Sequence, residues 1–286
     1  MNSIEEKKEN WSLEIYPKKK TKLINVRELW HKRDLLKMLI KKDVVTIYKQ
    51  TILGPFWFII QPLMTMLIYI IVFGNIANIP TDNIPKPLFY LSGIILWNYF
   101  TESLNSTSET FFSNSHIFGK VYFPRLIIPI SKIVSASIKF LIQLLLFILI
   151  YVFFLFENDA IKPTQFLLIV PLLFTFLFTT GLGLGLIFSS LTIKYRDLKF
   201  LIQFGIQLLM YSSPIIYPLS SVEGKLRIIM NYNPFAHIFE TFKFAFIGVG
   251  EVSINGLFYS FTFSITVLII GLYLFNKSEG SFIDTI

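Results

Sequence analysis

The chain has 286 residues, of which 53% are hydrophobic, 17% aromatic and only 15% charged, with a formal net charge of +8. This composition argues against one or two soluble domains and favours a protein with several membrane spans. The absence of cysteine excludes disulfides, thiolate catalysis and cysteine-ligated metal sites. Three histidines, His31, His116 and His237, are scattered without the spacing of a zinc site, so no metal is expected.

The N-terminal region is polar and then amphipathic. Residues 1–24 are rich in charge and lack an apolar core of signal-peptide length, so we expect a cytosolic extension. From Val26 to Ile47, apolar residues recur at offsets of three and four, which predicts a helix over residues 25–47 lying in the membrane interface. A soluble helix packed on another domain is the alternative. The positions expected to carry this interface helix are Arg27, Leu29, Trp30, Leu36 and Ile40.

Residues 48–286 are predicted to form an all-α transmembrane domain with six spans. The first lies in the uncharged run Gln50–Thr81, where Gly54, Pro55 and Pro62 predict local flexibility or kinks. The second begins at Leu88. The others are expected at Leu126–Phe156, within Pro163–Ile193, at Phe200–Tyr217 and within Val252–Asn276.

Short, proline-interrupted apolar pieces separate the last two spans. They are too short to cross a bilayer, which predicts a re-entrant pair of helices at about residues 219–248; an ordinary extracytoplasmic loop is the alternative. With six spans, most of the 26 lysines and arginines fall on the side of the termini, so both termini are expected in the cytosol. The positive charge therefore points to a membrane surface rather than to nucleic acid.

Charges inside predicted spans are expensive and usually functional. Glu102 and Glu109 are placed on one face of the second span, and we expect Lys139 on the next span to neutralise Glu102. A lysine that reaches back to the interface is the alternative. Gly181, Gly183 and Gly185 predict close helix packing, since the chain has no phosphate-binding glycine loop.

Some aromatic side chains are candidates for a lined path, because sugars stack on aromatic rings. The aromatic candidates are Trp57, Tyr90, Trp97, Tyr99, Phe100 and Tyr211. Further candidates for a conduit or gate are Gln61, Pro214, Tyr217 and Pro218.

Several segments carry a family resemblance. They are RELWHKRDLL, YKQTILGPFWFIIQPL, LFYLSGIILWNYF, IFGKVYFPRLIIPIS, KYRDLKFLIQFGIQLLMYSSPIIYP and Asn233-Pro234. Over about residues 25–276 the chain resembles the permease subunits of ABC exporters for bacterial cell-surface polysaccharides. It is most similar to the O-antigen lipopolysaccharide permeases, and teichoic acid and capsule exporter permeases are close relatives.

The resemblance implies a homodimer in the bacterial inner membrane that works with two separate ATPase subunits, which bind the ATP and Mg. Such permeases move a glycan on an undecaprenyl diphosphate carrier from cytosol to periplasm and are not enzymes themselves. A membrane glycosyltransferase and an ion-coupled secondary transporter are the rival readings.

The resemblance also assigns roles to individual residues. The connector at about residues 116–125 looks like the coupling helix that meets the ATPase, with His116, Phe118, Gly119, Lys120, Tyr122, Phe123 and Arg125 as contacts. Lys49, Arg125 and Arg196 are candidates for binding the lipid diphosphate. Their alternative role is that of ordinary positive anchors on the cytosolic side.

Overall fold

The computed structural model describes residues 26–49, 52–113, 123–157, 161–195 and 197–283, and every regular element in these residues is helical. Four helical stretches are long and apolar enough to cross a membrane. They are Gly54–Ile76, Ile127–Glu157, Gln165–Thr192 and Ile254–Ser278. The chain is therefore an all-helical protein with several membrane-spanning helices.

The first spanning stretch is irregular at both ends; Gly54 and Pro55 predict the irregular start, Pro62 lies within the continuous helix Trp57–Tyr69, and the irregular far end is not predicted from the sequence. Gly54 has a φ of +52° and begins a short 3₁₀ turn, Gly54–Phe56, which leads into α3 (Trp57–Tyr69). The end of the stretch, Ile70–Ile76, is a π-helix. The ammonium of Lys86 donates to the Gly74 carbonyl and the Asn75 side-chain oxygen, both at 2.7 Å, and so satisfies acceptors at this helix end.

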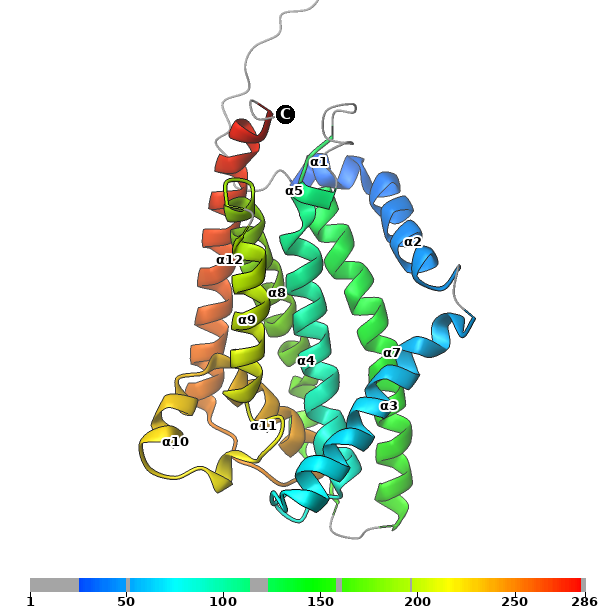
Figure 1. Ribbon diagram of the computed structural model, residues 1–286, viewed down its shortest axis with the longest axis vertical. Helices are drawn as coiled ribbons and strands as arrows, with labels where there is room; N and C mark the ends of the chain where they lie inside the picture. Colours follow the sequence, from blue (N-terminus) through cyan, green and yellow to red (C-terminus); the bar gives the residue numbers. More distant parts are fainter. Residues whose placement is uncertain (1–25, 50–51, 114–122, 158–160, 196, 284–286) are drawn as a thin grey trace, which may run out of the picture.

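The centre of the bundle is α4 (Lys86–Ser108), which packs against α3, α7 (Ile127–Glu157) and α8 (Val170–Thr192). Figure 1 shows α4 in the middle of the molecule, with α12 (Ile254–Ile283) beyond α8. A four-residue helix, α5 (Thr110–Ser113), follows α4. Most side chains in the first half of α4 are buried, so this helix carries much of the hydrophobic core.

The glycines of α8 allow close packing on two sides, as the sequence predicts. Gly181 and Gly185 lie against Ser103 and Thr107 of α4, while Gly183 lies against the backbone of α12 at Leu268. Glycines four residues apart share one helix face, and the glycine between them points elsewhere. α8 is thereby held between α4 and α12.

The fifth predicted span is shorter than expected. α9 (Leu198–Tyr211) has 14 residues, which at 1.5 Å per residue reach about 21 Å against a hydrocarbon core of about 30 Å. It ends at Tyr211 rather than Tyr217, because the chain turns through Ser212 and Ser213 before Pro214, which has no amide proton to continue a helix. The predicted boundary at Tyr217 is therefore wrong.

Two short helices follow at the end of the bundle opposite α1, as Figure 1 shows. After a 3₁₀ turn, Leu219–Ser221, come α10 (Gly224–Asn231) and α11 (Pro234–Ile247). α11 is largely buried against α12, α4 and the 3₁₀ turn Gln165–Ile169 that precedes α8, whereas α10 is mostly exposed. Asn233 caps α11, since its side-chain oxygen accepts from the Phe235 amide at 3.0 Å.

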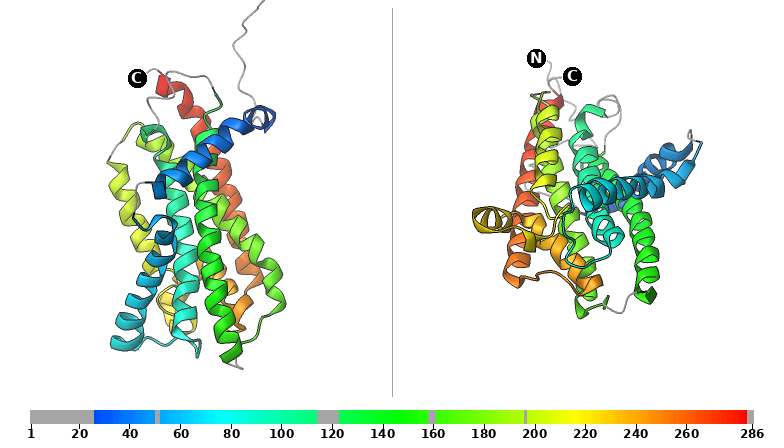
Figure 2. Two further views of the ribbon diagram at one scale, coloured as in Figure 1. Left: turned by 90° about the vertical axis from the view of Figure 1, so that its right-hand side faces the viewer. Right: turned by 60° about the horizontal axis from the view of Figure 1, so that its bottom comes forward.

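The predicted interface helix is two helices, α1 (Val26–His31) and α2 (Arg33–Lys49), which lie at the same end as the C-terminal end of α12. α2 runs obliquely across the bundle, as the left view of Figure 2 shows, and packs on α7. Part of the apolar face that we expected to meet lipid therefore meets protein. The residues in this contact are Leu29, Leu35, Leu36 and Leu39 on one side and Phe123, Ile127 and Ile128 on the other.

Candidate functional site

A polar face runs along the second half of α4. Glu102, Asn105 and Ser106 are followed by Glu109 at the end of the helix, so the four residues have offsets of zero, three, four and seven. Such offsets place side chains on one side of a helix. The opposite side carries Ser103 and Thr107, which are buried against α8. Packing against the α8 glycines therefore fixes the rotation of α4 and turns the polar face away from the core.

Each carboxylate on this face has a lysine partner from a neighbouring helix. Glu102 pairs with Lys139 of α7, which is the pairing that the sequence analysis predicts. Glu109 pairs with Lys199 of α9. Each pair favours the juxtaposition of α4 with its neighbour, and the first also neutralises Lys139, which lies within the apolar stretch Ile127–Glu157. The two pairs hold α7 and α9 on either side of the polar face.

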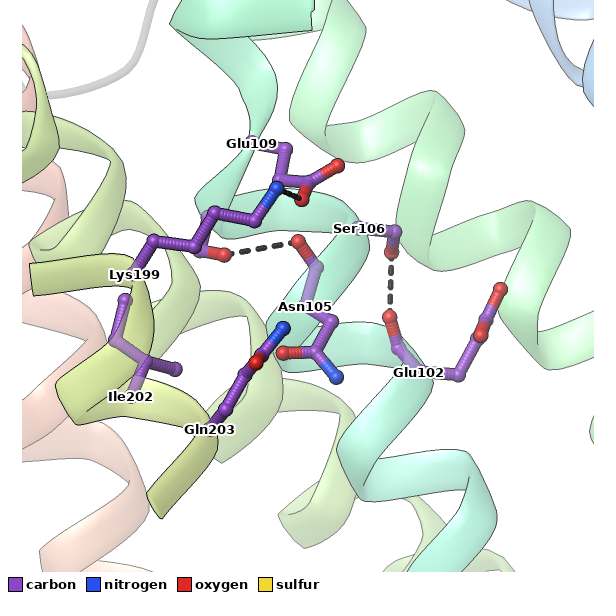
Figure 3. A pocket seen from close by; sticks show the side chains of 8 residues that line it. Glu102, Asn105, Ser106, Glu109, Lys199, Ile202 and Gln203 are labelled. Carbon is purple, nitrogen blue, oxygen red and sulfur yellow. Dashed lines mark hydrogen bonds and ion pairs between the residues drawn. The ribbon is translucent and has the colours of Figure 1, made fainter. Parts of the chain in front are cut away.

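A hollow of about 320 Å³ lies between α4 and α9. Figure 3 shows the side-chain amides of Asn105 and Gln203 pointing toward one another across it, while the Glu102 carboxylate turns away from Gln203. The hollow is lined by Glu102, Asn105, Ser106, Ser108, Glu109, Lys199, Ile202 and Gln203. It offers hydrogen-bond donors, acceptors and both signs of charge within one small space.

Only the two carboxylates of this hollow, Glu102 and Glu109, are candidate site residues from the sequence. Asn105 and Ser106 could have been found from the same three- and four-residue spacing. Lys199 stands among the charged residues that precede the predicted fifth span and has no partner nearby in the sequence, and Gln203 carries no signal of its own in a helix of otherwise apolar pattern. Only the fold shows that α9 brings both of them to α4.

The aromatic conduit candidates on α4 are wrong as surface residues of this subunit. Tyr90, Trp97, Tyr99 and Phe100 are all at most 6% exposed. The Tyr99 hydroxyl lies 3.1 Å from the Ser137 hydroxyl, and its ring stacks on Phe174. Because α4 is surrounded by other helices, its aromatic residues fill the core instead of lining a path.

The other conduit candidates divide between exposed and buried positions. Trp57, Gln61 and Tyr211 are exposed on α3 and α9, so they remain available to a ligand, lipid or second subunit. α3 and α9 meet where the Tyr69 hydroxyl donates to the Met210 sulfur at 3.7 Å.

The turn after α9 is tied to α11, and the gate candidates lie in this turn. The Pro214 carbonyl accepts from Lys243 at 2.7 Å, and the Asn233 amide donates to the Ser212 carbonyl at 2.8 Å. Tyr217 is half-buried and its hydroxyl donates to the Tyr211 carbonyl at 2.6 Å, while Pro218 is buried. Both Pro214 and Pro218 are therefore part of the packed turn.

Lys243 is a functional candidate that the sequence does not single out, since it lies as one charge within residues 219–248, the segment predicted to form the re-entrant helices. Its side chain is 2% exposed and lies 3.2 Å from Glu240, which is 4% exposed. The ammonium also lies 4.1 Å from the centre of the Phe89 ring. Burial lowers the pKa of Lys243, and the charge of Glu240 opposes that shift.

The described part of the predicted coupling connector begins at Phe123; His116, Phe118, Gly119, Lys120 and Tyr122 lie outside the described residues. Phe123 is buried with Leu29 and Leu36 packed on the same cluster. Trp30 is 68% exposed, and Ile40 lines a separate hollow between α2 and α7. Arg27 lies in α1. Leucines of α1 and α2 and the end of the connector thus pack together in one apolar cluster.

The three diphosphate candidates have different environments. Lys49 is exposed at the end of α2. Arg125 is 8% exposed, so its guanidinium is not open to a large anion in this conformation. Arg196 lies outside the described residues.

Curated relatives of the chain are polysaccharide transport proteins. The O-antigen export system permease protein RfbA of Klebsiella pneumoniae is 29% identical over 252 residues, which cover 88% of this chain and 94% of the relative. A protein of the same name from Myxococcus xanthus is 25% identical, with coverage of 77% and 83%. The polysialic acid transport protein KpsM of Escherichia coli is 27% identical, with coverage of 86% and 94%.

The family model described as "ABC-2 type transporter" matches residues 34–247. This match includes α2, the whole bundle up to α11 and the polar face of α4. The chain therefore belongs to the ABC-2 type transporter family.

Proposed function

We propose that this chain is the permease subunit of an ATP-driven exporter that moves an undecaprenyl-diphosphate-linked polysaccharide, O-antigen above all, from the cytosol to the periplasm. The observation that carries the proposal is the polar face of α4, a helix at the centre of an otherwise apolar bundle. Polar side chains at membrane depth cost free energy, so they are expected where they serve a function. A hydrophilic polymer that crosses the membrane needs such groups along its route. Family membership and the printed names of the relatives support the same function.

The proposed assembly is a homodimer in the bacterial inner membrane with two ATPase subunits on the cytosolic side, which bind the ATP and Mg. In this assembly α4 and α9 join the four apolar stretches as the second and fifth of six membrane segments. α10 and α11 form the re-entrant gate on the periplasmic side, and both termini are cytosolic. The exposed residues Trp57, Gln61 and Tyr211 would face the partner or the path.

The ATPase is proposed to bind at the end of the bundle formed by α1, α2 and the connector at residues 116–125. Support comes from the cluster in which Phe123 packs with leucines of α1 and α2, since it joins the interface helices to the connector. Large aromatic and aliphatic residues are the usual anchors of such interfaces.

A capsule or teichoic acid exporter is the second candidate. The similarity to the polysialic acid transport protein KpsM favours it, because that relative is covered almost as fully as the O-antigen permeases. The two candidates differ in the glycan and share the carrier-linked mechanism.

The function is tested by removing the gene for this chain from its host and restoring it on a plasmid. We expect surface glycan to disappear on removal, the lipid-linked glycan to accumulate in the cytosolic leaflet, and both effects to reverse on restoration. The restored protein should also copurify with an ATPase whose turnover depends on it. Full transport activity by the isolated chain without ATP would refute the proposal and favour a secondary transporter. Chemical identification of the accumulated glycan separates O-antigen from capsule and teichoic acid.

A further inference from the structure

The hollow between α4 and α9 is balanced in charge. Each of its two carboxylates is paired with a lysine, Glu102 with Lys139 and Glu109 with Lys199. A site for a diphosphate requires positive groups that are not already neutralised by carboxylates. The charge of the hollow therefore argues against the carrier's diphosphate as its ligand.

The uncharged groups of the hollow are better matched to hydroxyls. Asn105 and Gln203 each carry an amide that both donates and accepts hydrogen bonds. No side-chain hydrogen bond to either amide is present in the part of the chain that the structure describes. The two amides point toward one another from α4 and α9, as Figure 3 shows, so one ligand could contact both.

The apolar part of the hollow suits the same ligand. Ile202 lies one residue before Gln203 and lines the hollow together with the polar groups. Sugar rings present apolar C–H faces as well as hydroxyls, so a binding site with both kinds of surface matches them. The volume of about 320 Å³ lies at the lower end of the usual range for small-molecule sites, which is room for one or two sugar units.

We propose that this hollow is a contact site for the glycan itself, in which Asn105 and Gln203 bind sugar hydroxyls while the two ion pairs hold α4 and α9 in place around them. The inference rests on the proposed export function and assigns the substrate's sugar part, rather than its lipid diphosphate, to these residues. A site with two amides and no free charge binds weakly, which suits a polymer that must keep moving.

The absence of cysteine allows a direct test, because a single introduced cysteine is the only thiol in the chain. Gln203→Cys places a thiol in the hollow. Gln207→Cys is the matched control, since Gln207 is an exposed glutamine one turn further along α9 that does not line the hollow. Each full-length variant is expressed with a partner ATPase that cannot hydrolyse ATP, and inside-out vesicles with equal amounts of permease are treated with a small water-soluble maleimide.

Vesicles are prepared from cells that make the complete lipid-linked glycan, from cells that make only the carrier diphosphate with its first sugar, and from cells that make neither. We expect the complete glycan, still held by Asn105, to slow labelling of Gln203→Cys by about fivefold, which corresponds to occupancy of about four-fifths of the sites. Labelling of Gln207→Cys should not change. The truncated carrier should leave both rates as they are without glycan.

Three results would overturn the inference. The first is equal labelling of Gln203→Cys with and without glycan, and the second is equal protection of Gln203→Cys and Gln207→Cys. The third is protection of Gln203→Cys by the truncated carrier, which would assign the hollow to the diphosphate end of the substrate. The gene-removal experiment separates this failure from failure of the proposed function. If surface glycan depends on the chain but Gln203→Cys is not protected, only the glycan contact is wrong.

Discussion

The contact between α8 and α12 yields a quantitative prediction about stability. A β-carbon added at Gly183 would lie 2.7 Å from the Leu268 amide nitrogen, about 0.7 Å inside the 3.4 Å at which ordinary contact begins. The obstacle is backbone, which cannot move aside by changing a rotamer. Gly183→Ala therefore forces α8 and α12 apart, and a gap of about 0.5–1 Å loses a quarter to a half of the dispersion energy of each contact.

Gly205→Ala is the matched control for this substitution. Gly205 lies in α9 with nothing within 4 Å of the position of an added β-carbon. Both variants gain the same advantage of alanine over glycine in a helix, so the difference between them isolates the cost of overpacking. That cost is about 1–3 kcal/mol for a well-packed interior.

The measurement is the midpoint of thermal unfolding in detergent, followed as loss of the folded peak on size-exclusion chromatography. A shift of about 2–4 °C per kcal/mol is usual for a chain of this order of size, so Gly183→Ala should melt about 2–12 °C below Gly205→Ala. Equal midpoints would show that α8 and α12 can separate freely, and the argument that glycine is required at their contact would fail.

Three further predictions concern ion pairs and a helix cap. Lys243→Met leaves Glu240 as a buried charge without its ammonium partner and should cost about 3–5 kcal/mol of stability, measured as a fall in folded yield. The double variant Lys243→Met with Glu240→Gln should recover part of that yield. Equal yields for Lys243→Met and the unaltered chain would contradict the role of the pair. Asn233→Ala removes the cap of α11 and should lower stability by about 0.5–2 kcal/mol, whereas Asn231→Ala, at an exposed position, should not; thermal midpoints compare them. Asp43→Asn breaks a pair with Lys132 at 2.8 Å and should cost less than about 1 kcal/mol of stability. It should nevertheless lower the amount of glycan exported per ATP hydrolysed, whereas Asp34→Asn, the control on the same helix, should not. Equal export ratios for the two variants would exclude a coupling role of the Asp43–Lys132 pair.

The sequence was most informative where a constraint of the bilayer acts directly. Long uncharged runs predicted the four apolar spanning stretches, and the cost of charge in the membrane predicted the pairing of Lys139 with Glu102. The glycines of α8 were correctly assigned to helix packing. In each case one physical requirement left the chain few alternatives.

The sequence could not show which side of a helix faces the core. Tyr90 and Trp97 are aromatic residues in an apolar run, and this pattern is the same whether they line a path or fill an interior. They fill the interior because this part of α4 is surrounded by other helices. Lys243 carries no signal of burial in the predicted re-entrant segment, although Glu240 three residues earlier already offers a partner on the same helix face. The shortness of α9 depends on the turn at Ser212 and Ser213, which belongs to the packing of α11 as much as to the local sequence.

The arrangement of α2 changes the expected route of mechanical coupling. Continuity of the chain suggests that motion of the interface helix passes to the first span, which follows it directly in the sequence. In the fold, α2 packs along α7, where its leucines contact Ile127 and Ile128 and its Asp43 pairs with Lys132. Two turns further along α7, Lys139 binds Glu102 on the polar face of α4.

A displacement of α2 by a bound ATPase would therefore reach the polar face through α7, a single rigid helix of 31 residues. The contacts along this route are of two kinds, an apolar cluster at its start and an ion pair at each of two later positions. Close-packed apolar contacts transmit strain, and the attraction within each ion pair opposes separation of the two helices that carry it. If an ATPase binds at α2, we expect it to move α7 relative to α4, and the Lys139–Glu102 pair would carry that movement to Glu102 at the edge of the hollow.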